Sequence, residues 1–145
     1  MLFRSKLGLK CWNLGIGGAS NDTAFRCASY WIPKLKPRYV CYMPTFANRL
    51  EIITPDKIER YLPSYEFYSS EDKKFYDKWL SMEENGKLNK EKNIRGIKSI
   101  CDENAIPIIV EELDSVGFSS KARDMVHPGK DWNNTISNKI LSKIS

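Results

Sequence analysis

A short apolar segment that runs into a glycine-rich turn most constrains the fold of this chain. Residues 10–14 read KCWNL, and the next eight residues read GIGGASND. This order predicts a strand, a tight loop and then a helix capped by Ser20, Asn21 or Asp22. Apolar side chains at helical spacing continue until the KPR at 36–38 ends the pattern. The first unit is therefore a strand followed by a helix.

The rest of the chain continues this alternation. An apolar strand is predicted at 39–43, followed by a loop, and a buried strand is predicted at 107–110. Helices are predicted at about 70–81, with Ser70 as a candidate cap, at 88–104, and from a cap at Asp131 to Ile144. We therefore predict an α/β fold, a three-layer sandwich with a short parallel sheet flanked by helices.

Length and aromatic content bear on the domain organisation. The 145 residues are 41% hydrophobic, which fits a single domain over 1–145. The stretch 51–82 is predicted to be an aromatic-rich insertion that is irregular outside its one helix. Its large rings either pack as a satellite core, which is favoured for most of them, or cap a site and stack on sugar rings or acyl chains. These rings are Tyr61, Tyr65, Phe67, Tyr68, Phe75, Tyr76 and Trp79.

Charge and cysteine content narrow the choice of partners. Lys and Arg number 23 against 18 Asp and Glu, but the two signs interleave and no arginine-rich run occurs, so a nucleic-acid partner is disfavoured. No secretory signal or apolar run of roughly 18 residues occurs, so we expect no membrane association and a cytoplasmic protein. No cofactor or metal site is predicted.

The cysteines lack CxxC spacing and are predicted to be reduced core thiols, namely Cys11, Cys27, Cys41 and Cys101.

The only histidine, His127, lies three residues after Asp124 and directly before a Pro-Gly pair. A histidine that acts as a general base needs an acceptor for its Nδ1–H, so that Nε2 faces the nucleophile. Asp124 can be that acceptor if the chain turns, as Pro-Gly favours. The alternative is a surface histidine near a helix start, because so short a pattern also occurs by chance.

The glycine-rich turn is a second candidate site. Its functional interpretation is that the Gly18 amide stabilises an oxyanion, whereas the alternative is turn geometry alone. Ser20 lies beside it, but helix capping is the more frequent role for a serine at such a position. The loops that follow parallel strands meet at one sheet edge, where these residues would converge with Asp124 and His127.

Taken in order, NLGIGGASNDT, LKPRYVCYMPT and ARDMVHPG resemble the motifs of the SGNH hydrolase (GDSL esterase) family, over roughly Lys10 to Ile144. The resemblance implies a flavodoxin-like fold with Gly18 as the oxyanion amide. It also implies that His127 is the base and Asp124 its orienting carboxylate. The stretch 51–82 has no assigned counterpart.

Two motifs depart from the family pattern. The nucleophilic serine of the family follows an earlier strand in a Gly-Asp-Ser motif, which the nine residues before Lys10 lack. We therefore expect an N-terminally incomplete member. Its first strand and serine come from an upstream complementing segment, or its sheet is completed by a second copy, or its remaining strands pair directly. Where the family carries Gly-x-Asn-Asp, this chain has MPTFANR. A match without a gap places Phe46 at the asparagine of the family motif. Asn48 supplies the side-chain amide only if the loop shifts by two residues. Arg49 is a further candidate contact for an oxyanion or another anion.

These features predict an SGNH-type esterase that hydrolyses a small-molecule or carbohydrate ester, such as an acetylated sugar, and that is incomplete or inactive in this chain. The alternative is a non-catalytic accessory module that binds a glycan or a protein through the same edge.

Overall fold

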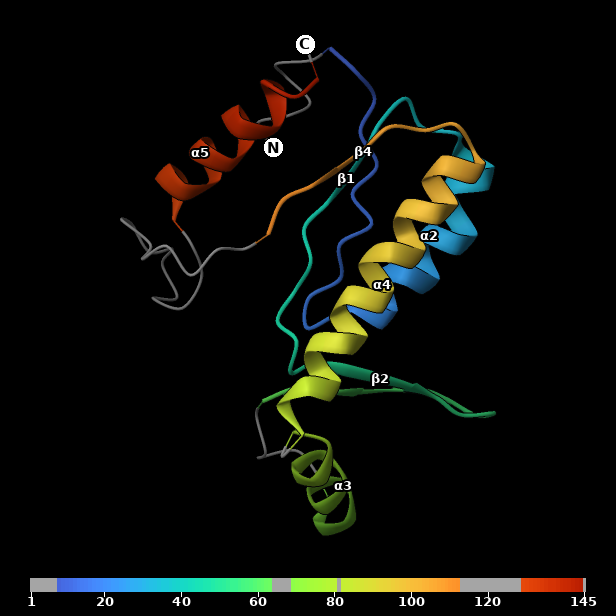
Figure 1. Cartoon of the computed structure of the whole chain (residues 1–145), viewed down its shortest axis with the longest axis vertical. Helices are drawn as coiled ribbons and strands as arrows, with labels where there is room; N and C mark the ends of the chain where they lie inside the picture. The colour runs from blue at the N-terminus through green and yellow to red at the C-terminus, as the bar shows by residue number, and fades with distance from the viewer. Residues whose placement is uncertain (1–7, 64–68, 81, 113–128, 145) are drawn as a thin grey trace. The chain divides into compact units, whose positions relative to one another are not determined.

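A computed structural model of the chain describes residues 8–63, 69–80, 82–112 and 129–144 (Figure 1). The chain falls into two compact units. The larger unit comprises Leu14–Val40 and Pro44–Ile108, and the smaller one comprises Cys41–Met43 with residues 8–13 and the described part of Ile109–Ser145.

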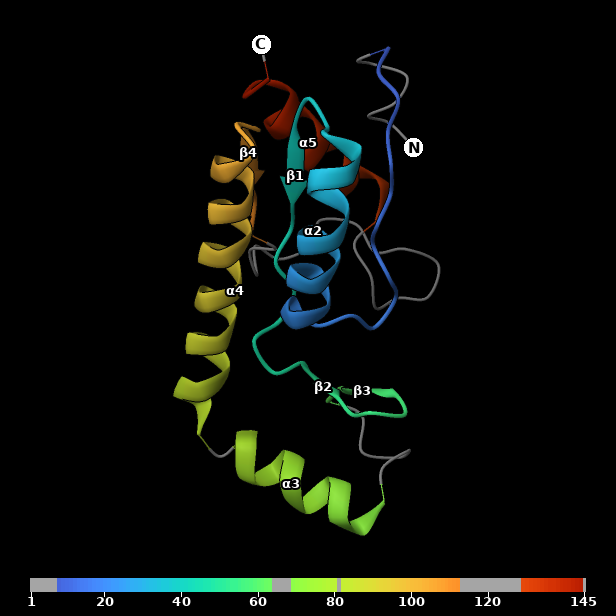
Figure 2. The same cartoon turned by 90° about the vertical axis from the view of Figure 1, so that its right-hand side faces the viewer.

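Two helices, α2 (Asn21–Leu35) and α4 (Glu83–Glu103), form the core of the larger unit and lie side by side in Figures 1 and 2. Gly96 of α4 leaves room for the Phe25 ring of α2, because a Cβ atom there would lie 2.6 Å from Cε2 of Phe25. Ile32, Ile97 and Cys101 are buried in this core. The predicted 88–104 helix is therefore confirmed, and it begins five residues earlier than expected.

Local sequence signals set both ends of α2. The N–H of Thr23 donates to Oγ of Ser20 at 3.3 Å, and the N–H of Ser20 donates back to Oγ1 of Thr23, which makes a capping box. The helix ends at Leu35 because Lys36 adopts a left-handed conformation and Pro37 follows it. The predicted cap and the predicted end are both confirmed.

An antiparallel hairpin and a helix occupy the aromatic-rich stretch. Strands β2 (Leu50–Ile53) and β3 (Ile58–Tyr61) pair with Leu50 opposite Tyr61, so the prediction of an irregular segment is wrong here. The turn TPDK between them has proline and aspartate at turn positions, a signal for this hairpin that the sequence carries.

Helix α3 (Ser70–Leu80) confirms the helix predicted at about 70–81 and packs aromatic rings against the hairpin. The residue that caps it is Ser69 rather than Ser70, because Oγ of Ser69 accepts the N–H of Asp72 at 3.1 Å. Tyr76 and Tyr61 are buried and stack with ring centroids 6.4 Å apart. Packing is therefore the role of these two rings, as predicted.

The predicted strands near 40 and 108 both form and pair in parallel. Strand β1 (Val40–Tyr42) lies beside β4 (Ile108–Val110), with the N–H of Val40 donating to the carbonyl of Pro107 at 3.0 Å and that of Glu111 to the carbonyl of Tyr42 at 3.1 Å. The chain is thus a mixed α/β protein with two small sheets, one parallel and one antiparallel. None of the helices in the described ranges has the length and apolar run that crossing a membrane requires.

Helix α5 (Lys130–Leu141) belongs to the smaller unit and confirms the predicted final helix. Its N-cap residue is Gly129 and not Asp131, which lies in the first turn, where a negative charge suits the helix dipole. Hydrogen bonds from Lys139 and Lys143 to the buried carboxylate of Glu111 hold the pKa of that carboxyl below its usual range.

The segment 10–14 forms no strand, contrary to the prediction. Trp12 and Leu14 remain 42% and 40% exposed, so the burial that would stabilise a strand there is lacking. The expectation of core thiols is confirmed only for Cys101. All four cysteines are free, but Cys11 and Cys41 are exposed.

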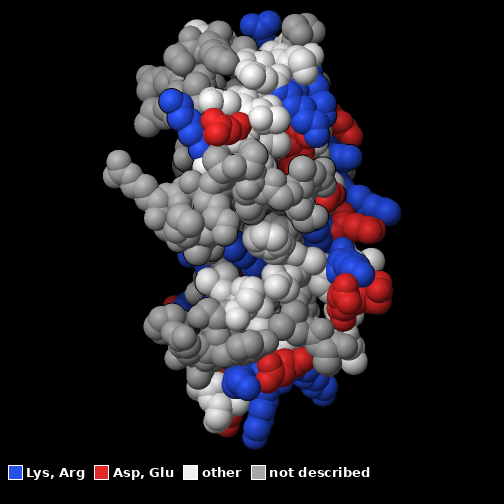
Figure 3. Space-filling view, turned by 90° about the vertical axis from the view of Figure 1, so that its left-hand side faces the viewer, with Lys and Arg blue, Asp and Glu red and all other residues white. Residues whose placement is uncertain are grey.

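Charged side chains of both signs are interspersed on the face shown in Figure 3. Along α4 they form exposed pairs one turn apart, such as Lys87 with Glu83 at 2.8 Å and Arg95 with Glu91 at 3.8 Å. This pattern agrees with the interleaved charges of the sequence, which favour a solvated helix face.

Candidate functional site

The glycine-rich segment forms a tight turn directly before α2. The N–H of Ala19 donates to the carbonyl of Ile16 at 3.1 Å, which closes a four-residue turn with Gly18 in its third position. Gly18 has a φ of 72°, as a type II turn requires at that position, and this conformation favours glycine. Turn geometry therefore accounts for Gly18 by itself.

Three sets of hydrogen bonds join this turn and the start of α2 to the segment after β1. The side-chain amide of Asn21 donates to the carbonyl of Thr45 at 3.2 Å and accepts the N–H of Thr45 at 2.9 Å. Nη1 of Arg49 donates to the carbonyl of Ala19 at 3.4 Å. The N–H of Glu51 donates to Asp22 at 3.2 Å. We call residues 16–22 together with 45–51 the loop junction.

Ser20 is committed to helix capping within the loop junction. Its side-chain oxygen accepts the N–H of Thr23 and donates to a carboxylate oxygen of Asp22 at 3.2 Å. The residue is only 2% exposed. A hydroxyl with these partners and this burial is not poised to attack a substrate.

Asn48 and Arg49 carry unused hydrogen-bonding capacity. Within the described ranges, Oδ1 of Asn48 and Nε of Arg49 are buried and lack a hydrogen-bond partner. The Asn48 backbone is nevertheless well held, because the Tyr76 hydroxyl donates to its carbonyl at 2.7 Å. Native structures pair most buried polar atoms, so these two atoms are candidate ligand contacts. Both residues are predicted site residues, and both lie in the loop junction.

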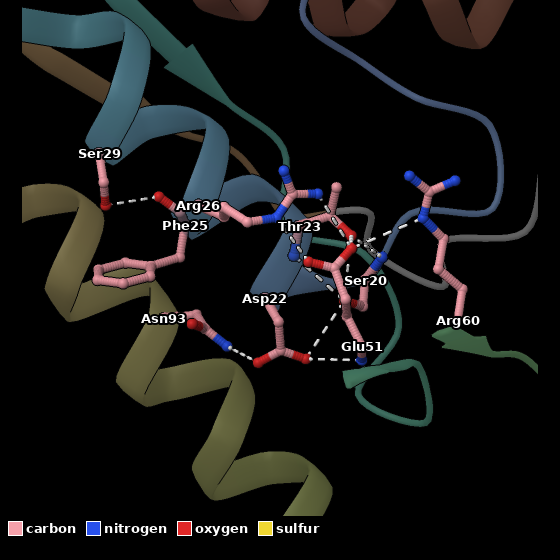
Figure 4. A network of polar contacts seen from close by, with 9 residues as sticks. All are labelled: Ser20, Asp22, Thr23, Phe25, Arg26, Ser29, Glu51, Arg60 and Asn93. Atoms are coloured by element: carbon pink, nitrogen blue, oxygen red, sulfur yellow. Dashed lines mark hydrogen bonds and ion pairs between the residues drawn. The ribbon is translucent and has the colours of Figure 1, made fainter. Parts of the chain in front are cut away.

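An ion-pair network around the buried carboxylate of Glu51 extends from the loop junction (Figure 4). Arg26 donates to the carboxylate of Glu51 at 2.9 Å, Thr23 donates to it at 2.5 Å, and Nε of Arg60 lies 3.6 Å away. Desolvation alone would raise the pKa of Glu51. The hydrogen bonds from Arg26 and Thr23 and the charges of Arg26 and Arg60 outweigh it, so the pKa of Glu51 lies below its ordinary value.

No local sequence signal predicts this network as a whole, because its members are far apart in the chain. Asp22 extends it, accepting from the side-chain amides of Asn89 at 2.9 Å and Asn93 at 2.8 Å. One part of the network has a sequence signal, the turn TPDK between β2 and β3. A hairpin built on this turn places Glu51 opposite Arg60 in the strand register.

Two cavities flank these contacts in the larger unit. One of about 720 Å³ is lined in part by Asp22, Phe25, Arg26, Tyr30 and Glu51, whose polar members belong to the ion-pair network. The other, of about 370 Å³, lies against the segment 46–48. Its walls include Phe46, Asn48, Trp79, Met82, Glu83 and Lys87.

Asp124 and His127 lie outside the described residues, so the structure does not test the proposed base. Of the other predicted site residues, Arg49 reaches the carbonyl of Ala19 between Gly18 and Ser20, whereas Asn48 lines the smaller cavity. No group of three His, Cys, Asp or Glu side chains suited to a metal ion occurs in the described ranges. Comparison of the chain with protein-family models, with curated proteins and with solved structures found no match.

Proposed function

We propose that this chain is an SGNH-type domain for ester hydrolysis in which the loop junction forms the oxyanion side of the site. The supporting observation is that two of the three matched motifs are hydrogen-bonded to each other, although Asn21 and Thr45 are 24 residues apart. The parallel pairing of β1 with β4 supports the finer part of the proposal, a three-layer sandwich around a short parallel sheet.

The proposed chemistry is acyl transfer to water. A serine hydroxyl attacks the ester carbonyl while Nε2 of His127 takes its proton, and His127 then gives that proton to the leaving alcohol. Asp124 holds the Nδ1–H of His127. Donors of the loop junction, namely the Gly18 amide and the side chains of Asn48 and Arg49, stabilise the oxyanion. Water then cleaves the acyl-serine by the same proton transfers.

The proposal assigns the nucleophile to a complementing segment, because Ser20 is buried as a helix cap. The same observation favours a second candidate function, a non-catalytic module that binds a glycan or protein through the loop junction. The two functions differ in whether Asp124 orients His127 as a general base. The position of the proton on the His127 ring distinguishes them.

The tautomer of His127 tests the proposed base. If Asp124 accepts from the imidazole, the neutral ring carries its proton on Nδ1, and Asp124→Ala should transfer the proton to Nε2. Two-bond 1H–15N spectra distinguish the two forms, and the single histidine makes the assignment unambiguous. The matched control is Asp131→Ala, an exposed aspartate in the first turn of α5, which should leave the tautomer unchanged.

The rate of ester hydrolysis provides a second test of the proposed base. The chain alone should hydrolyse p-nitrophenyl acetate slowly, because a triad without its nucleophile retains only residual catalysis. In the chain without a nucleophilic serine we expect His127 to activate water directly. His127→Ala should therefore lower this rate about a hundredfold, the lower end for loss of a general base. A fluorophosphonate probe should leave the intact mass unchanged, whereas a His127-dependent adduct on Ser20 would overturn the assignment of the nucleophile. An Nε2–H tautomer in the unaltered chain, with turnover indifferent to His127→Ala, would support the binding module instead.

A further inference from the structure

We propose that the smaller cavity binds a sugar ring, which makes the substrate a carbohydrate ester. We call it the Phe46 cavity, after the aromatic ring on its wall, and its volume of about 370 Å³ lies in the range of small-ligand sites. This inference rests on the proposed function, because it assigns the ester's alcohol part to a specific place beside the loop junction.

Phe46 is an exposed ring on a firmly held loop. Its side chain is 55% exposed. The backbone on either side is fixed, since Asn21 holds Thr45 through two hydrogen bonds and Tyr76 holds the carbonyl of Asn48. The guanidinium of Arg49 lies 5.4 Å from the ring centre, which restrains the ring further. A solvent-facing aromatic ring on a backbone held in this way is suited to pack against the apolar C–H face of a sugar.

A second aromatic side chain, Trp79 of α3, lines the same cavity. The loop approaches α4 closely, because a Cβ atom at Gly86 would lie 2.8 Å from the carbonyl oxygen of Ala47. The cavity wall is therefore built from three segments, residues 46–48, the end of α3 and the start of α4. Contacts of this kind pre-form the site and reduce the ordering cost of binding.

The polar groups of the cavity match hydroxyls better than an acyl chain. Asn48 lines the cavity, and its Oδ1 is a buried acceptor without a partner in the described ranges, to which a sugar hydroxyl can donate. Glu83 and Lys87 form an exposed ion pair at 2.8 Å and offer further acceptors and donors. A hydrocarbon ligand would leave Oδ1 of Asn48 unpaired, at a cost that a sugar avoids.

The cavity also lies next to the proposed oxyanion donors. Asn48 lines it, and the following residue, Arg49, reaches the carbonyl of Ala19 beside Gly18. A sugar ring in the Phe46 cavity can therefore extend an acylated hydroxyl toward the loop junction.

Binding of unesterified oligosaccharides tests this inference without turnover. We would titrate the full chain with xylotetraose and with chitotetraose, and separately with sodium octanoate, and follow the chemical shifts by NMR. At least one saccharide should bind, and Phe46→Ala should weaken that binding about tenfold. Tyr30→Ala is the matched control, because Tyr30 is also 55% exposed but lines the other cavity. Asn48→Leu, which keeps the side-chain size, should also weaken the binding.

The outcomes separate this inference from the proposed function. It is overturned if neither saccharide binds, if octanoate binds in their place, or if Tyr30→Ala weakens binding as much as Phe46→Ala does. His127→Ala should retain saccharide binding, because the cavity does not involve that residue. If no saccharide binds but the tautomer of His127 depends on Asp124, the chain is still a hydrolase and its substrate is not a carbohydrate ester. Saccharide binding at Phe46 without that tautomer would leave a glycan-binding module.

Discussion

Replacing Glu51 by alanine should lower the free energy of unfolding of this chain by about 3 kcal/mol, the lower end for breaking a buried ion pair. The Glu51 side chain is 1% exposed and receives donors from Arg26, Arg60 and Thr23. The cost stays at the lower end because the two arginine side chains are 37% and 36% exposed and regain hydration. The buried Thr23 hydroxyl does not, since it loses its acceptor inside the protein.

Urea denaturation measures this loss as a shift in the transition midpoint. The control is Glu91→Ala, which removes an exposed pair with Arg95 at 3.8 Å and should cost under about 0.5 kcal/mol. Equal losses for the two variants would show that the Glu51 network does not stabilise the fold.

The same carboxylate gives the stability a pH dependence of known sign. Because the pKa of Glu51 is lower in the folded chain than its ordinary 4.5, its contribution is fully present above that value and is lost as the pH falls through the lower folded-state pKa. Glu51→Gln should therefore destabilise the chain most near neutral pH. Its difference from the unaltered chain should shrink in acid, which urea titrations at several pH values would reveal. A difference that is independent of pH would contradict the role of the ionised carboxylate.

Replacing Tyr76 by alanine should destabilise the chain by about 4 kcal/mol, as for other buried aromatic residues truncated to alanine. Tyr76 is fully buried, stacks on Tyr61 and donates to the carbonyl of Asn48 at 2.7 Å. The substitution removes a ring from the packing between α3 and the hairpin, leaves a cavity and releases the loop that carries Phe46.

Two companion variants separate packing from hydrogen bonding. Tyr76→Phe keeps the ring and removes only the donor to Asn48, so it should cost about 1 kcal/mol. Phe75→Ala truncates the neighbouring ring, which is 45% exposed, and should cost clearly less than Tyr76→Ala when urea midpoints are compared. A loss for Tyr76→Ala no larger than that for Phe75→Ala would contradict a core role for Tyr76.

Sequence patterns identified the elements whose signals are local. The cap of α2 at Ser20 and its end before Pro37 depend on residues within one turn of the helix, and the structure has both. Strands β1 and β4 were predicted because each is a short, continuous apolar run. The segment 10–14 carries a similar pattern but forms no strand, because a strand also needs a neighbour and burial, and no local pattern encodes either.

The sequence by itself therefore determined the mixed α/β character, the main helices and the identity of Ser20 as a cap. It also named Asn48 and Arg49, although the role of Asp124 and His127 stays a prediction because both lie outside the described residues. Only the tertiary structure decided which residues meet. Asn21 binds Thr45, and Tyr76 holds the carbonyl of Asn48. Glu51 pairs with Arg26 and with Arg60. Except for the pair of Glu51 with Arg60 inside the hairpin, the partners are 24 or more residues apart in the chain. Such contacts depend on how the chain packs, whereas caps and turns depend only on the residues beside them.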